Sequence, residues 1–140
     1  MKKFFPLILA LICVLGFSCC VVKWYKRFPQ IDAQRVEKIT VWSYTARQQL
    51  DSDEIDKFIQ MYRSSQYNGN GTGEGGTPEF GASVYYIDGS VLHVNDFQTM
   101  GRDFEVTLFD ATGKREVWCY INNQALLEYL SMLVVSPYRE

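Results

Sequence analysis

The side chains of this 140-residue chain that could do chemistry are few and lie far apart in the sequence. His93 is the only histidine, and Cys119 is the only cysteine after residue 20. With Asp96 they could form a cysteine–histidine–acid arrangement, which would make the protein a hydrolase using His93. A lone histidine and a cysteine within an expected strand are more often structural, and no serine lies in a nucleophile elbow. We therefore expect no catalytic residues and no enzyme activity.

The glycine-rich stretch 64–81 matches two ligand-binding patterns only in part. Residues 71–76 read Gly-Thr-Gly-Glu-Gly-Gly, but a dinucleotide-binding loop follows a strand and opens a helix, whereas this stretch follows an expected helix. Oxygen-bearing residues spaced as in an EF-hand loop end at Glu79, yet the first of them, Asn68, is neutral and no exit helix follows. No cysteine or histidine pairs have zinc-ligand spacing. We expect neither a metal nor a cofactor.

Charge divides the chain into two regions. Residues 1–27 carry five Lys and Arg and no acid, whereas residues 28–140 carry nine Lys and Arg against all 16 Asp and Glu, a net charge of −7. An acidic domain without a run of cations is a poor match for phosphates, so we expect no nucleic-acid partner. The basic cluster at residues 23–27 suits anionic headgroups, and membrane lipid is the first expected partner.

Residues 4–22 contain no charged side chain, and three interpretations of this stretch stay open. It is long enough for a retained transmembrane anchor, because 19 residues of helix span about 28 Å. It resembles a bacterial lipobox, with Cys19 as the lipid attachment site, although Gly16 stands where such signals usually have Leu. It could also be a cleaved secretory signal, since Gly16 and Ser18 are small. All three interpretations predict that the chain is inserted into or exported across a membrane, and they favour an extracytoplasmic domain. A domain that faces the cytoplasm remains an alternative.

The elements that would position the remaining side chains follow from the periodicity of apolar residues. Residues 36–44 alternate as a strand, and acids at 51–54 open a helix whose apolar residues recur at 55, 58, 59 and 62. Asp-Gly at 88–89 and the turn at 110–113 indicate hairpins over 82–94 and 104–121. Asn122 or Asn123 would cap a final helix with a leucine stripe, and residues 64–81 would form a mobile loop.

This order, β-α-β-β-β-β-α, predicts an α+β domain with two helices on one face of a mostly antiparallel sheet. We place the anchor or signal segment in residues 1–27, a linker in 28–34 and the domain in 35–140. The layout resembles the small membrane-attached extracytoplasmic domains common in bacteria, in architecture and not in any motif. The single cysteine of the domain allows no internal disulfide, which excludes a disulfide-stapled scaffold.

Strand alternation sends one set of aromatic residues away from the helices, and this set is the candidate partner-binding site. Its members are Trp42, Tyr44, Phe109, Trp118 and Tyr120. An exposed aromatic face of this size is larger than most monomers leave in water, and Trp and Tyr dominate binding hot spots. We expect a membrane-attached module of immunity or inhibitor type that binds a protein or cell-envelope partner. The alternative is an accessory or structural subunit of a membrane complex. The glycine-rich loop could instead cover the rings.

Overall fold

The computed structural model describes residues 28–73 and 76–135. The expectations for residues 1–27, including the anchor, the signal and lipid attachment at Cys19, fall outside these ranges. Within them, no helix combines the length and the apolar character needed to span a membrane.

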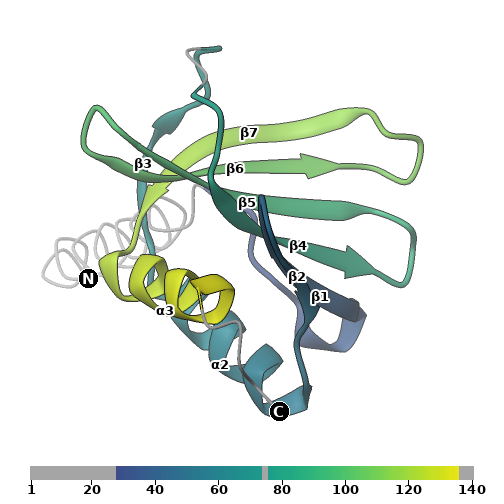
Figure 1. Ribbon diagram of the computed structural model, residues 1–140. Coiled ribbons are helices and arrows are strands. Elements are labelled where there is room, and N and C mark those ends of the chain that lie inside the picture. Colours follow the sequence, from purple (N-terminus) through teal and green to yellow (C-terminus); the bar gives the residue numbers. More distant parts are fainter. Residues whose placement is uncertain (1–27, 74–75, 136–140) are drawn as a thin grey trace, which may run out of the picture.

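The fold is α+β, as the sequence predicts, and its sheet has seven strands that pair antiparallel throughout the described residues (Figure 1). The order across the sheet is β2-β1-β4-β5-β6-β7-β3. The strands are β1 (Val36–Ser43), β2 (Arg47–Gln49), β3 (Gln66–Asn70), β4 (Phe80–Tyr86), β5 (Val91–Thr99), β6 (Arg102–Phe109) and β7 (Arg115–Asn122). The expected hairpins at 88–89 and 110–113 are present, and two further hairpins among the described residues, β1–β2 and β5–β6, were not predicted.

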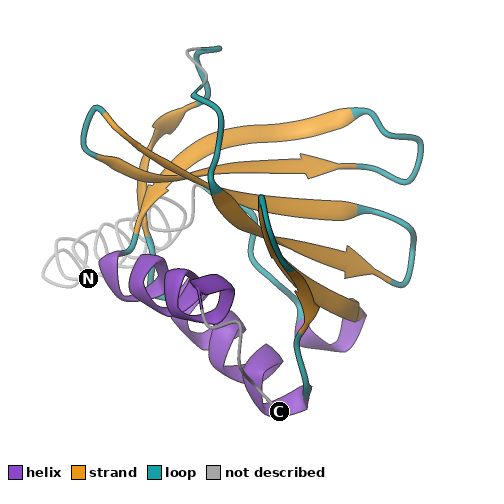
Figure 2. Ribbon diagram, in the orientation of Figure 1, coloured by secondary structure: helices purple, strands orange, loops and turns teal. Residues whose placement is uncertain are grey.

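Two helices, α2 (Ser52–Arg63) and α3 (Gln124–Val135), lie on the same side of the sheet (Figure 2). A short 3₁₀ turn, η1 (Ala33–Arg35), precedes β1. Helix α2 begins with a capping box: Asp51 accepts from the Glu54 N–H, and Glu54 accepts from the Asp51 N–H. Asn123 caps α3 by accepting from the Leu126 N–H at 3.0 Å. Its amide also donates to the Met61 carbonyl at 2.7 Å, which joins the two helix ends.

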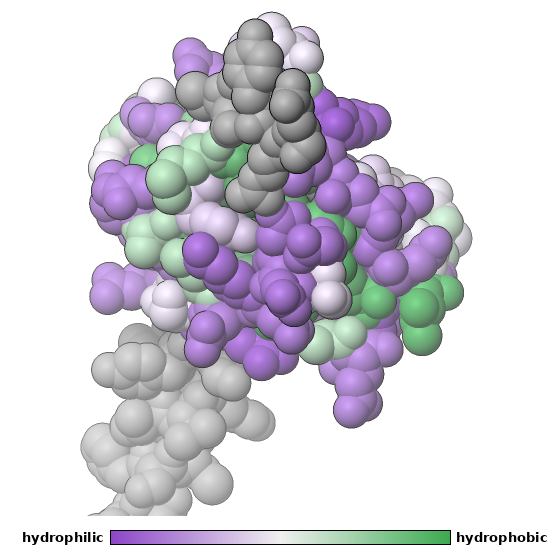
Figure 3. Space-filling model, turned by 60° about the horizontal axis from the view of Figure 1, so that its bottom comes forward, coloured by the Kyte–Doolittle hydropathy of each residue, from purple (hydrophilic) through white to green (hydrophobic). Residues whose placement is uncertain are grey.

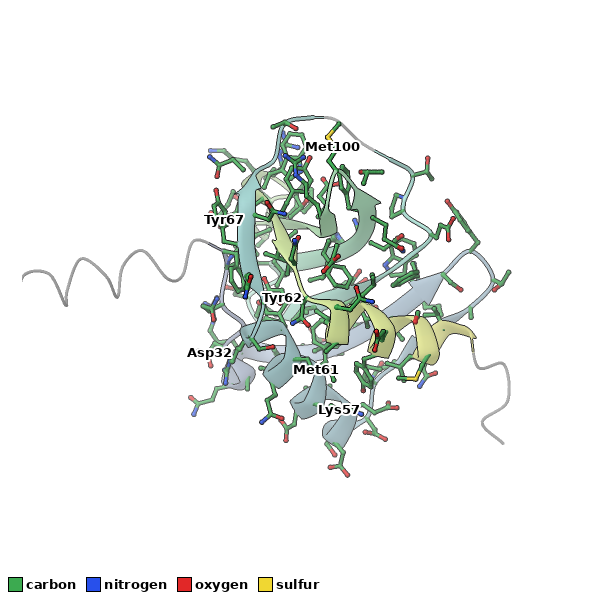
Figure 4. All side chains as sticks on the ribbon, turned by 90° about the vertical axis from the view of Figure 1, so that its left-hand side faces the viewer. Asp32, Lys57, Met61, Tyr62, Tyr67 and Met100 are labelled. Atoms are coloured by element: carbon green, nitrogen blue, oxygen red, sulfur yellow. The ribbon has the colours of Figure 1, made fainter. Side chains whose placement is uncertain are left out.

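The core lies between this inner face of the sheet and the helices. One cross-strand row consists of Val41, Ala82, Val94, Val106 and Cys119, all buried. From the helices, Phe58, Tyr62, Leu126 and Leu130 meet these strands with essentially no exposed surface. Figure 4 shows Tyr62 pointing into this layer, whereas Lys57 lies at the periphery.

The expected linker at 28–34 belongs to the folded domain, so the predicted boundary at residue 35 is wrong. Phe28 and Ile31 are buried in the core, and the Phe28 ring meets the Tyr62 ring edge-on at 5.4 Å. The Tyr62 hydroxyl donates to the Pro29 carbonyl at 2.8 Å. Two apolar residues three apart are too short a pattern to distinguish a packed segment from a linker.

The expectation of one loop over residues 64–81 is also wrong in part, because Gln66–Asn70 forms the edge strand β3 against β7. The segment that follows must cross β7, β6 and β5 to reach β4, since those strands lie between β3 and β4 in the sheet. We call residues 71–79 the crossing segment; residues 74–75 are outside the described part.

Candidate functional site

The face of the sheet opposite the helices, which we call the outer face, is built from three cross-strand rows. The pairing register defines the first row as Arg47, Trp42, Gly81, Asn95, Glu105 and Tyr120. The second row is Gln49, Thr40, Ser83, His93, Thr107 and Trp118. The third row is Lys38, Tyr85, Val91, Phe109 and Arg115. Directly paired residues of antiparallel strands point to the same side, so these side chains share one surface. No described helix covers it (Figures 1 and 2).

Three of the five predicted partner-binding residues lie on this face and are partly exposed: Trp42, Phe109 and Trp118. Tyr120 also belongs to it, but its exposed fraction is 0%, so the expectation that its ring is exposed is wrong. Thr107 is buried as well, at 7%. Tyr120 in this conformation lies beneath the surface of the outer face.

The Trp118 ring is held on three sides. Its indole N–H donates to the Glu105 carboxylate one strand away. The Arg115 guanidinium carbon lies 4.2 Å from the ring, within the range of a cation–π interaction. A side chain fixed in this way loses little rotamer freedom when a partner binds, which is a property of binding hot spots.

Gly71 forms the third side. Its N–H donates to the Trp118 carbonyl at 2.8 Å, and a Cβ placed on Gly71 would lie 2.1 Å from the Trp118 ring carbon Cδ2. Only glycine allows the backbone to approach the indole so closely. The three ring atoms nearest to that Cβ are Cδ2, Cγ and Cε2, so the glycine-rich stretch covers part of one face of the indole, while Trp118 remains partly exposed.

Tyr120 is buried because it belongs to a small second cluster on the outer side. The Phe97 ring lies 4.8 Å from the Tyr120 ring, and the Arg102 guanidinium lies 4.1 Å above it. The Tyr120 hydroxyl, Arg102 Nη1 and Asn95 Oδ1 are buried and form no hydrogen bond with the described residues. The irregular pairing between Asp96 and Thr99 turns Phe97 onto Tyr120, and nothing in the sequence pattern signals this bulge.

Tyr44 is the fifth predicted residue, and it lies apart from the rest. It follows the end of β1, is 68% exposed and lines a groove with Phe80 and Val134. The structure therefore separates Tyr44 from the outer-face rings.

The cysteine–histidine–acid arrangement considered from the sequence does not form. Cys119 lies on the inner face, where burial raises the pKa of its thiol to about 11, whereas His93 lies on the outer face. Asp96 accepts from the backbone N–H groups of Glu79 and Phe80, which fixes the end of the crossing segment. The sheet itself keeps these groups apart.

His93 instead pairs with Ser83, with 2.9 Å between the serine Oγ and the histidine Nδ1. Burial lowers the pKa of His93, and the Phe109 ring packs edge-on against it at 5.7 Å. Among the described residues no carboxylate is hydrogen-bonded to His93, so this serine–histidine pair lacks the third group that orients a catalytic base. Ser83 and His93 therefore form a cross-strand hydrogen bond between β4 and β5.

Two of the residues with calcium-loop spacing, Asn68 and Asn70, form side-chain hydrogen bonds within the domain. Asn68 donates to the Gly101 carbonyl and to Asn122, and Asn70 accepts from the Tyr67 hydroxyl. Within residues 28–73 and 76–135, no three His, Cys, Asp or Glu side chains are grouped as metal ligands.

A cavity of about 260 Å³ lies between residues 29–35 and the hairpin turns at 88–89 and 110–113. Four carboxylates line it, from Asp32, Asp88, Asp110 and Glu116. Asp88 pairs with Arg35, and turn hydrogen bonds hold the pKa values of Asp88 and Asp110 below the usual range. These acids mainly close turns, so the outer face remains the candidate site.

The contributions of β2, β4 and β5 to the outer face were not predicted from the sequence. Tyr85 and Ser83 alternate with the buried Ala82 and Val84, so period-2 alternation was a usable signal for them. Arg47 belongs to a three-residue edge strand for which the sequence carries no clear signal.

Comparisons with protein-family models, curated proteins and solved structures find no match for this chain.

Proposed function

We propose that this chain is a membrane-attached binding module without catalytic activity, with its domain outside the cytoplasm. It engages a protein partner through the outer face. The uncharged stretch 4–22 and the basic cluster after it support membrane attachment. The side chains of the folded domain support the binding role.

One observation carries the binding role: Trp42, Tyr85, Phe109 and Trp118 are partly exposed on the side of the sheet that no described helix covers. A sheet needs one apolar face to form a core, and the inner face already provides it. Four large rings on the second face exceed that requirement. The fixed orientation of Trp118 adds to the case, because pre-organised aromatic side chains lower the entropic cost of binding.

The test replaces Trp42 and Trp118 with Ala in the full chain and measures co-purification of partners from membranes. We expect capture to be lost while the circular dichroism spectrum and the unfolding midpoint stay close to wild type. Met132, 63% exposed on α3, provides the matched control, since Met132→Ala removes an exposed apolar side chain from the helix side. A double variant that unfolds would identify the rings as core residues and end the proposal. Equal loss of capture in Met132→Ala would move the site to the helices.

A further inference from the structure

Charge is distributed unequally between the outer face and the rest of the domain. The three outer-face rows contain Lys38, Arg47 and Arg115 but a single acid, Glu105, a net charge of +2. The remaining described residues carry five Lys and Arg against 13 Asp and Glu, a net charge of −8. Figure 3, seen from the helix side, shows a mostly hydrophilic surface there. The outer face is thus a basic surface on an acidic molecule.

The cations of this face stand beside its rings. Lys38 Nζ lies 5.0 Å from the Tyr85 ring centroid, and the Arg115 guanidinium lies 4.2 Å from the Trp118 ring. Arg47 is the cross-strand partner of Trp42. The one acid, Glu105, already accepts the Trp118 indole N–H. The rings of Tyr85, Trp118 and Trp42 therefore each have a cation beside them. The single carboxylate already accepts a hydrogen bond from another residue of the outer face.

From this arrangement we infer that the outer face binds an acidic, aromatic-containing segment of a partner polypeptide, an inference that rests on the proposed function. Aromatic residues and Arg are enriched at the centres of protein interfaces, and complementary charge fixes the partner and its orientation. Carboxylates of the segment would pair with Lys38, Arg47 and Arg115. Its aromatic side chains would pack on the Trp and Tyr rings.

A long uniform polyanion fits this surface less well than a folded or peptide partner. Double-stranded DNA carries one charge per about 1.7 Å of its axis. Six strands about 4.8 Å apart give the face a width of only about 24 Å. Beyond that width the polymer would meet the acidic remainder of the domain. A polypeptide can place its acids over the three cations and leave the rest of its surface neutral.

The experiment uses the full chain in a zwitterionic detergent, with a random Glu–Tyr copolypeptide as the probe and tryptophan fluorescence as the readout. We expect binding that weakens as NaCl rises from 50 to 300 mM. Lys38→Gln and Arg115→Gln should each raise the Kd several-fold, and the double variant about tenfold or more.

Lys57 supplies a matched control, because its Nζ also lies over a tyrosine ring, 4.5 Å from the centroid of Tyr129, but on the helix side. Lys57→Gln changes the net charge of the domain by the same amount as Lys38→Gln and should leave the Kd unchanged. Every variant retains residues 1–27, so the cations of that segment cancel in the comparison.

Three groups of results overturn the inference. The first is equal weakening by Lys57→Gln and Lys38→Gln, or equally tight binding of oligothymidylate or polygalacturonate, which would indicate attraction to any polyanion. The second is Arg115-dependent self-association in sedimentation velocity, which would make a second copy of this acidic chain the occupant. A probe that does not bind, together with partner capture that still needs Trp42 and Trp118, rejects the acidic chemistry and leaves the proposed function standing. A probe that does not bind, together with partner capture that does not depend on Trp42 and Trp118, rejects both the inference and the proposed function.

Discussion

The two faces of the same sheet differ in what their side chains do. On the inner face, aliphatic and aromatic residues such as Ile39, Val84, Leu92 and Phe104 are completely buried and belong to one apolar cluster. On the outer face, rings, hydroxyls, a histidine and three cations share the surface. Its contacts are cation–π interactions and single hydrogen bonds rather than a continuous apolar layer. The inner face therefore specifies the fold, and the outer face is the surface that we propose for recognition.

Adjacent residues of one strand make this division measurable. Leu92 and His93 are neighbours on β5, yet Leu92 faces the core with 0% exposure and His93 pairs with Ser83 on the outer side. Substitutions that differ by a single position should therefore test different properties. If the faces are divided as described, inner substitutions change stability, and outer substitutions change binding.

The largest effect is expected for Leu92→Ala. It removes a fully buried side chain and leaves a cavity, which should lower the free energy of unfolding by about 2–5 kcal/mol. The neighbouring outer-face change, Val91→Ala, should cost less than about 1 kcal/mol, because Val91 is only partly buried. Denaturant unfolding of the full chain in detergent, followed by circular dichroism, measures both. Equal costs would show that the outer face is also core and would break the comparison.

The next effect tests the contact between Gly71 of the crossing segment and the Trp118 ring on the outer face. Gly71→Ala puts a methyl group into the space of the Trp118 indole, so either the ring or the crossing segment must move, at a cost of about 1–3 kcal/mol. Tryptophan fluorescence should shift with the change, because the environment of Trp118 changes.

Gly76→Ala is the matched control, since a Cβ at Gly76 meets nothing within 4 Å. We expect it to change stability by no more than about 0.5 kcal/mol and to leave the fluorescence spectrum unchanged. Should Gly71→Ala behave in the same way, the contact between Gly71 and the indole contributes nothing to the position of Trp118.

The inner half of this division could be predicted from the sequence, and the outer half only in part. Period-2 alternation predicted the strand at 36–44 and a hairpin over 104–121, and Ile39, Val41 and Val106 on these strands are buried, because one buried face imposes a regular pattern. The same alternation placed Trp42 and Trp118 on the other side. It could not show that Tyr120 is buried, since that depends on an irregular pairing in β5 that turns Phe97 onto the ring.

The edge strands were beyond sequence reasoning for a different reason. β3 is polar and contains Gly69, so it has the composition of a loop, and it is a strand only because β7 offers an unpaired edge. The charge of the outer face was hidden as well. Lys38, Arg47 and Arg115 are far apart in the chain, and only the register of five successive strand pairs brings them onto one surface.

The smallest effect expected is the pH dependence of stability that His93 contributes on the outer face. Burial lowers the pKa of His93 in the folded protein below its ordinary value of 6.5. Above pH 6.5 the imidazole is neutral in both states, and stability is unaffected. As the pH falls through 6.5 towards the folded-state pKa, the unfolded chain binds the proton more readily, so the folded state loses stability.

His93→Gln isolates this contribution, because glutamine can still hydrogen-bond to Ser83 but does not titrate. The stability of the wild type relative to His93→Gln should be lower at pH 5 than at pH 7.5, and the carboxylates common to both proteins cancel in that difference. Leu92→Ala, compared with the wild type in the same way, should show no such change with pH, because it alters no titrating group. A constant difference between wild type and His93→Gln would mean that the imidazole is as well solvated when folded as when unfolded. The outer face would then be open at its centre, and Phe109 and Ser83 would not enclose the ring as the structure shows.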